Sequence, residues 1–277
     1  MNEAVRMLFG AWLLPGWQTI WIVAFWVVLA AFAWLETVSP AFAAAPARER
    51  RWPTNFALGI INMIIAPIAP VSALIGAQWA QNNDWGLLNV LDAPFWLALA
   101  ATVLLRSFAG YLFHVLMHKV RAFWRLHRVH HSDDRLDVST TIRTHPIELV
   151  ALILTMTPLA VLLGLDPLVL VAYELAEALI SLFSHANLRL PERIDRPLRW
   201  LIVTPNMHCI HHSSHLPETD SNYGQVFSFW DRLFGTYSDA PHLGYDAMEI
   251  GLGEIRDERT ADFWFQIRSP ILRSLKK

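Results

Sequence analysis

The chain is dominated by long runs of apolar residues separated by short polar stretches. A helix needs about 20 apolar residues to cross roughly 30 Å of hydrocarbon. Five runs reach or approach that length: residues 17–38, 56–80, 94–117, 147–165 and 168–183. The pattern predicts an all-α fold, a multi-span helical membrane bundle.

Two of these runs contain residues that predict their shape. Pro67 and Pro70 interrupt the second run, so we expect this segment to be kinked or re-entrant. Only residues 164–167 separate the last two runs, and the Gly and Pro among them predict a tight helical hairpin.

The first run could instead belong to a signal peptide, because residues 41–47 (AFAAAPA) are small, like those of a cleavage site. However, the apolar run at 17–35 is longer than the roughly 7 to 15 residues of a signal-peptide core. We therefore expect a first spanning helix.

Composition supports the membrane class. Hydrophobic residues make up 54% of the sequence and charged residues only 17%. The net charge of −2 gives no basic excess, so nucleic-acid binding is not expected. Cys209 is the only cysteine, which excludes a disulfide framework, a thiolate zinc cluster and an iron–sulfur cluster within this sequence. Twelve histidines make nitrogen the expected metal donor.

Basic residues predict the orientation of the bundle. Arginines follow the first run at 48–51, and Lys and Arg follow the third at 119–135, whereas the links at 81–93 and 164–167 contain neither. By the positive-inside rule, residues 119–146 and everything after residue 184 lie in the cytoplasm. We therefore expect an integral, multi-pass membrane protein with a cytoplasmic helical cap.

Histidines occur in three short motifs on this side. The motifs are HVLMH (His114 and His118), HRVHH (His127, His130 and His131) and HCIHH (His208, His211 and His212). Spacings of three and four residues place the imidazoles of each motif on one helix face, where they can converge on a shared ion. A lone HxxxH motif arises often by chance, but one HxxxH together with two HxxHH motifs does not. We therefore expect all eight motif histidines to bind metal.

Eight imidazoles exceed what one ion with open positions can bind, so the cap is predicted to hold a histidine-rich dimetal site. HVLMH lacks the glutamate that follows the first histidine of the zinc-protease motif HExxH. Imidazole suits iron, zinc, copper and nickel alike, so the spacing leaves the identity of the metal open.

The order of the motifs, with a helical hairpin before the last one, resembles the fatty acid hydroxylase and sterol desaturase superfamily of integral-membrane, histidine-box di-iron enzymes. The resemblance covers about residues 95–238. It extends to RTHPIE at 143–148, TPNMHCIHHS at 204–213, PETDSNYG at 217–224 and WDRLFGT at 230–236.

The resemblance implies that the motif histidines bind two Fe ions, with zinc able to replace iron in purified protein, and that O2 is the co-substrate. It also implies a lipid substrate and an external electron donor protein. A further ligand is implied at His185, in SHANL at the end of the last run. Many members carry another histidine four residues later, where this chain has Arg189.

The leading functional hypothesis is therefore a non-haem di-iron monooxygenase or desaturase. It would hydroxylate or desaturate a C–H bond of a lipid such as a sterol, fatty acyl chain or carotenoid. The alternative is a membrane metallohydrolase that uses metal-bound hydroxide on a lipid ester, but the chain lacks an HExxH-type base. A metal transporter would need polar ligands near the midplane of several helices, whereas these histidines cluster at one end.

We expect three regions: N-terminal membrane spans in residues 1–92, a hydroxylase-like catalytic domain in residues 93–238, and a cytoplasmic amphipathic tail in residues 239–277. Aromatic and basic residues alternate in this tail and should lie on an anionic membrane surface. They are Phe263, Trp264, Phe265, Arg268, Arg273, Lys276 and Lys277.

Several residues near the motifs could orient the histidines, because a metal-bound imidazole usually donates its other N–H to an acceptor. These second-shell candidates are His145, Glu148, Asp220, Asn222, Tyr223 and Asp231. Glu148 follows His145 by three residues and could orient it. Helix capping, turn formation and packing are the alternatives for all six.

A polar stripe marks the last apolar run, where Glu174, Glu177, Ser181 and His185 recur at spacings of three and four. Acids within a membrane are costly and usually face the bundle interior. Arg106 lies two turns before His114 and could pair with either glutamate. Such a pair would either fix helix packing or belong to a substrate or proton path. His215 and His242 resemble solvated loop residues and are left unassigned.

Overall fold

The computed structural model describes residues 17–42, 48–68 and 72–272. Within these ranges the chain forms helices joined by turns, with isolated β-bridges at Ile202–Phe227, Ser213–Ile250 and Leu252–Ile255. The long helices are α2 (Trp17–Val38), α3 (Arg48–Ile68), α6 (Phe95–Lys119), α8 (Pro146–Leu163) and α9 (Pro167–His185). The predicted all-α fold is confirmed.

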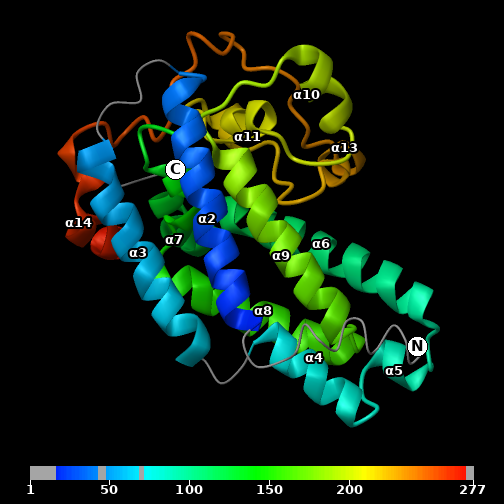
Figure 1. Ribbon diagram of the computed structural model, residues 1–277. Coiled ribbons are helices and arrows are strands. Elements are labelled where there is room, and N and C mark those ends of the chain that lie inside the picture. Colours follow the sequence, from blue (N-terminus) through cyan, green and yellow to red (C-terminus); the bar gives the residue numbers. More distant parts are fainter. Residues whose placement is uncertain (1–16, 43–47, 69–71, 273–277) are drawn as a thin grey trace.

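Shorter helices lie at the two ends of this bundle (Figure 1). At one end, α4 (Ala73–Asn82) and α5 (Leu87–Val90) pack against α8. At the opposite end lie α10 (Glu192–Leu198), α11 (Pro205–His211) and α13 (Phe229–Phe234). The remaining short elements are α7 (Arg121–His131), η2 (Val138–Ile142), α12 (Leu216–Thr219), η3 (Glu258–Ala261), α14 (Phe263–Arg268) and η4 (Ser269–Ile271).

Four of the helices are long and apolar enough to cross a membrane: the Trp21–Val38 part of α2, and all of α6, α8 and α9. They coincide with four of the five predicted runs. The chain therefore has the spans of a multi-pass membrane protein.

The predicted second span, residues 56–80, is not one helix. α3 begins earlier, at Arg48, with the polar turn RERR, and ends at Ile68, one residue after Pro67. α4 then starts at Ala73 and, with 10 residues, is about 15 Å long. That is too short to cross the hydrocarbon. The expected interruption is present, and it separates two helices.

Arginines at the start of α3 are held in ion pairs. Arg51 is fully buried, and its guanidinium lies 2.8 Å from Asp133 and also pairs with Asp137. The more exposed Arg50 lies 3.2 Å from Asp134. These contacts connect α3 to the segment after α7. They partly neutralise the arginine charges that were used to predict the orientation of the bundle. The cytoplasmic placement of the cap stays a prediction.

α8 and α9 form the predicted hairpin. α8 ends at Leu163 and is capped by Gly164, whose φ of +64° lies in the left-handed region that favours glycine. Asp166 caps α9 by accepting hydrogen bonds from the backbone N–H groups of Leu168 and Val169, and Pro167 occupies the first helical position. The turn sends α9 back toward the histidine-bearing end of the bundle.

The described part of the C-terminal region packs on α7. Arg128 donates hydrogen bonds to the backbone oxygens of Ser269 and Leu272, and Ser132 donates to the buried Gln266. Trp264 is exposed, and membrane anchoring by this tail stays a prediction. Arg273, Lys276, Lys277 and most of the small-residue stretch at 41–47 lie outside the described residues.

Candidate metal centre

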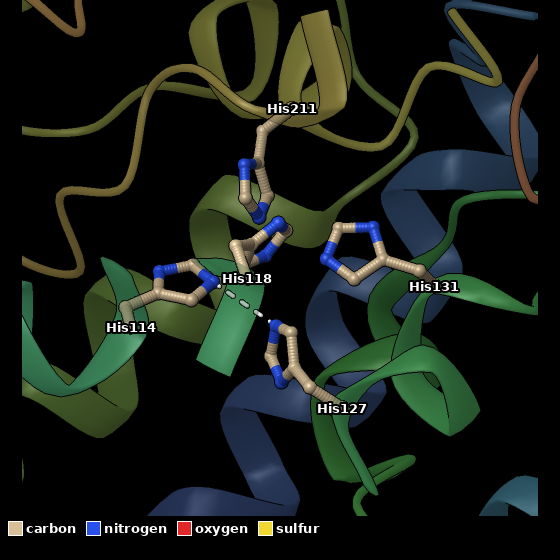
Figure 2. Close-up of side chains that lie close together, drawn as sticks. All are labelled: His114, His118, His127, His131 and His211. Atoms are coloured by element: carbon tan, nitrogen blue, oxygen red, sulfur yellow. Dashed lines mark hydrogen bonds between the residues drawn. The ribbon is translucent and has the colours of Figure 1, made fainter. Parts of the chain in front are cut away.

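Nine histidines converge into two neighbouring groups. The first contains His114, His118, His127, His131 and His211, and the second contains His130, His185, His208 and His212. Within each group, one ring nitrogen of every member lies within 4.8 Å of the others, and all nine residues are buried. Figure 2 shows how the rings of the first group point toward a common centre.

Each HxxHH motif contributes to both groups, whereas the sequence predicted that each motif converges on one ion. On α7, His127 and His131 belong to the first group and His130 to the second. Helical geometry explains the division. Because a helix turns by about 100° per residue, side chains four positions apart lie about 40° from each other around its axis. A side chain three positions after the first lies about 60° from it in the opposite direction, so it points toward the other group.

Two ring nitrogens of the first group, Nε2 of His114 and Nε2 of His127, face each other. His114 donates from Nδ1 to the carbonyl oxygen of Tyr223 at 2.8 Å, and His127 donates from Nδ1 to the Glu148 carboxylate at 2.7 Å. Because both partners only accept, a neutral ring has its lone pair on Nε2. The two Nε2 atoms are 3.1 Å apart, an arrangement that a cation between them would stabilise.

The second group repeats this arrangement. His130 donates from Nδ1 to the carbonyl oxygen of Arg143 at 3.3 Å, and His185 donates from Nδ1 to that of Ser181 at 2.8 Å. Their Nε2 atoms lie 3.1 Å apart, and Nε2 of His208 lies 3.0 Å from that of His185. His185 thus sits among the motif histidines.

These separations fit nitrogens that share an ion. Imidazole nitrogens bind metals such as zinc at about 2.0–2.1 Å, so two of them on one ion lie about 3.0–3.4 Å apart at common coordination angles. Nε2 of His131 is buried without a hydrogen-bond partner among the described residues. Nine donors in two groups therefore fit two ions; the motifs predicted two ions from eight histidines, and the resemblance implied His185 as a further ligand.

The protonation state also suits metal binding. Burial, followed by repulsion from neighbouring histidines, lowers the pKa of His130, His131, His208 and His212 well below the usual value. These rings are neutral at neutral pH, which is the form that ligates a metal.

Glu148 orients a histidine, although a different one from that expected. Its carboxylate binds His127, whereas the sequence suggested His145. His145 instead caps α8, where its Nδ1 accepts from the backbone N–H of Ile147 and its Nε2 lies 3.2 Å from the carbonyl oxygen of Ile267. Among the described contacts, His145 makes no hydrogen bond to the nine histidines.

The loop after the third motif supplies acceptors for three of the rings. Oδ1 of Asp220 lies 3.5 Å from Nδ1 of His118. The carbonyl oxygen of Ser221 accepts from Nδ1 of His211 at 2.7 Å, and that of Tyr223 accepts from His114. Backbone carbonyls carry no residue-specific signal, so the sequence could not show the roles of Ser221, Ser181 and Arg143.

Asn222 and Asp231 shape this loop. Asn222 has a φ of +53°, and its side chain donates to the carbonyl oxygens of Met207 and Ser238. Asp231 accepts hydrogen bonds from the backbone N–H groups of Tyr223 at 2.7 Å and Gly224 at 2.8 Å. Both residues therefore act on the histidines through the backbone that carries the carbonyl acceptors.

A cavity of about 710 Å³ lies beside the centre. His114, His127, His130, His185 and His208 line it together with Glu148. Much of the remaining wall is apolar and comes from α2, α3, α6, α8 and α9, including Phe25, Trp26, Met63, Phe113, Met117 and Leu152. The predicted polar stripe also faces it through Glu174, Glu177 and Ser181. A cavity of this size can accommodate a long apolar ligand.

Comparison with known families agrees with this geometry. Residues 99–236 match the family model described as Fatty acid hydroxylase. The chain belongs to the fatty acid hydroxylase family. The matched region contains all nine histidines and the loop that orients them, so the resemblance noted from the motifs is confirmed.

Several curated members of the family are similar to the chain. It is 33% identical to the ornithine lipid hydroxylase OlsE of Rhizobium tropici over 176 residues, which are 63% of this chain and 50% of that protein. It is 28% identical to alkylglycerol monooxygenase of Xenopus tropicalis over 209 residues, 72% of this chain and 43% of that protein. It is 30% identical to a cholesterol 25-hydroxylase-like protein of Danio rerio over 139 residues, 50% of this chain and 54% of that protein.

The chain spans about half the length of these fatty acid hydroxylase relatives. No solved structure matched it.

Proposed function

We propose that this protein is an O2-dependent membrane oxidoreductase that hydroxylates or desaturates a C–H bond of a lipid, with two iron ions bound by the nine histidines. The observation that supports it best is the pair of histidine groups, each with facing lone pairs, beside an apolar cavity. The names of the relatives, which are hydroxylases and monooxygenases, favour hydroxylation over desaturation.

Bound iron would supply the oxidising power that an unactivated C–H bond requires. The chain's own residues do the positioning. Glu148 and the carbonyl oxygens of Ser221 and Tyr223 fix the ring orientations, and the apolar wall holds an alkyl segment beside the histidines while it excludes water.

The balance of the reaction defines one partner. Hydroxylation consumes one O2, two electrons and two protons; one oxygen atom enters the C–H bond and the other leaves as water. The donor of the two electrons is, in this proposal, a separate protein. A histidine centre at the end of the bundle, next to membrane-spanning helices, would be reachable by both a lipid and a soluble donor.

The test is metal content and Mössbauer spectra of protein purified without air in mild detergent. We expect two irons per chain in the wild type and loss of iron in the His211→Ala variant, since His211 is fully buried in the first group. His242→Ala is the matched control, because His242 is outside both groups and lies on the surface.

A lipid-product screen by mass spectrometry with O2 and a reductant then tests the reaction. Retention of zinc alone under conditions that preserve iron, together with hydrolysis of a lipid ester, would contradict the proposal and favour the metallohydrolase.

A further inference from the structure

The cavity has a second polar region on α9, distinct from the histidines. Glu174 and Glu177 line the wall there, and Arg106 of α6 lies behind Glu177. Glu174 precedes His185 by eleven residues, which is about 16 Å of helix. This region therefore faces a different part of a bound ligand from the part that reaches the metal centre.

Arg106 is committed to one of the two glutamates. Its Nη2 donates to Oε2 of Glu177 at 2.7 Å and its Nη1 to Oε1 at 3.3 Å, while its guanidinium lies over the ring of Tyr173 at 5.4 Å. Such a two-point contact satisfies the Glu177 carboxylate. The buried ion pair anticipated from the sequence is present, and Glu177 is its acid.

Glu174 has no comparable partner. Among the described contacts it makes no hydrogen bond, although Arg106 attracts it over a longer distance. It is half-buried on a helix that is long and apolar enough to cross a membrane, and it lines the cavity. A carboxylate at such a position is costly unless something compensates it.

A second acceptor on the cavity wall is also unsatisfied. Asn62 of α3 donates from Nδ2 to the carbonyl oxygen of Thr144 at 2.8 Å, which fixes its amide. Its Oδ1 is buried with no hydrogen-bond partner among the described residues. The wall thus offers two acceptors, Glu174 and Asn62, that a ligand with hydrogen-bond donors would satisfy.

We propose that Glu174 selects a substrate lipid that carries a protonated amine, with an alkyl segment between that amine and the carbon at the histidines. Two carboxyl groups and one arginine lie in this region, and Arg106 binds Glu177, so an ammonium group beside Glu174 would supply the partner that the second carboxyl group lacks. The third carboxyl group on the cavity wall, that of Glu148, does not belong to this region, because it lies at the histidine end and binds His127. The inference rests on the proposed function, since it names the substrate class of the same cavity.

Equilibrium binding tests the proposal without turnover. The full chain is placed in zwitterionic phosphatidylcholine nanodiscs at neutral pH, and binding of radiolabelled hexadecylamine, hexadecanol and hexadecanoate is measured with empty nanodiscs subtracted. We expect the amine to bind about 10-fold or more tightly than the alcohol, and the carboxylate to bind most weakly. Glu174→Gln should remove this preference, while Glu174→Asp should keep most of it.

Glu192→Gln on the exposed α10 is the control and should bind all three probes like the wild type. Equal binding of amine and alcohol by the wild type, or a preference that survives in a folded Glu174→Gln variant, would overturn the proposal. Because the binding measurement needs no turnover, the amine preference tests this proposal, while the iron content separately tests the oxygenase function.

Discussion

Glu148 accepts a hydrogen bond from Nδ1 of His127 at 2.7 Å, and both side chains are buried beside the cavity. The contact holds the lone pair of His127 toward the first histidine group and makes the ring a stronger donor. Glu148→Gln should therefore weaken metal binding by about 10- to 100-fold. Competition with a chelator measures this change, and an unchanged affinity would show that Glu148 serves packing alone.

Arg51 should contribute far more to stability than its neighbour Arg50. Arg51→Met would leave Asp133 and Asp137 buried without their partner, and we expect a loss of about 3–5 kcal/mol in the free energy of unfolding. Arg50→Met breaks the partly exposed pair with Asp134 and should cost about 0–1 kcal/mol. Unfolding in detergent, followed by helical circular dichroism, compares the two variants. Equal losses would contradict the burial argument.

Gly86 and Gly164 are in backbone contact where α5 meets the α8–α9 turn. A Cβ on Gly86 would lie 2.4 Å from the backbone N of Gly164, and the φ of +92° at Gly86 is itself unfavourable for alanine. Gly86→Ala should thus destabilise the protein by about 1–3 kcal/mol or more.

Gly235 provides the control for this substitution, because its φ is +71° and a Cβ there meets nothing within 4 Å. Gly235→Ala should cost only about 1–2 kcal/mol of backbone strain. Thermal unfolding of both variants separates the loss of stability caused by the steric clash from the loss caused by backbone strain. A smaller loss of stability in Gly86→Ala than in Gly235→Ala would refute the close contact.

Metal removal should loosen the histidine helices selectively. Without an ion the facing Nε2 atoms of His114 and His127, and of His130 and His185, repel each other. An ion at 100 times its dissociation constant stabilises the folded state by about 2.7 kcal/mol. Hydrogen exchange should increase after chelation in α7 and α11, and much less in α4, which is remote from both groups. Uniform exchange across the chain would argue against a local metal site.

The sequence predicted the chemistry of the site better than its geometry. Histidine spacing selected eight histidines that the structure brings together, and the family resemblance added His185, which lies among them. The division of each HxxHH motif between two groups was missed, because periodicity shows which residues share a helix side but not where the neighbouring helices lie. Glu148 was likewise selected correctly as an acceptor near the histidines, while its partner depends on how α8 packs against α7.

The fold shows the same limit. Hydrophobic runs located α2, α6, α8 and α9 and the turn at Gly164, since those signals are local. The run at 56–80 was expected to be one kinked or re-entrant segment, because apolar composition does not show that the interruption near Pro67 separates two helices. Burial of Arg51 was also invisible, since its partners lie more than 80 residues away in the chain.

His130 and His131 are adjacent in the chain yet belong to different groups, so α7 contributes to both candidate sites, and α11 does the same. The two candidate sites therefore share their supporting helices. Whichever ion binds first would order those helices, and the second ion would meet donors that are already in place. Metal loading should consequently be cooperative, with chains that carry one ion scarce beside chains that carry two or none.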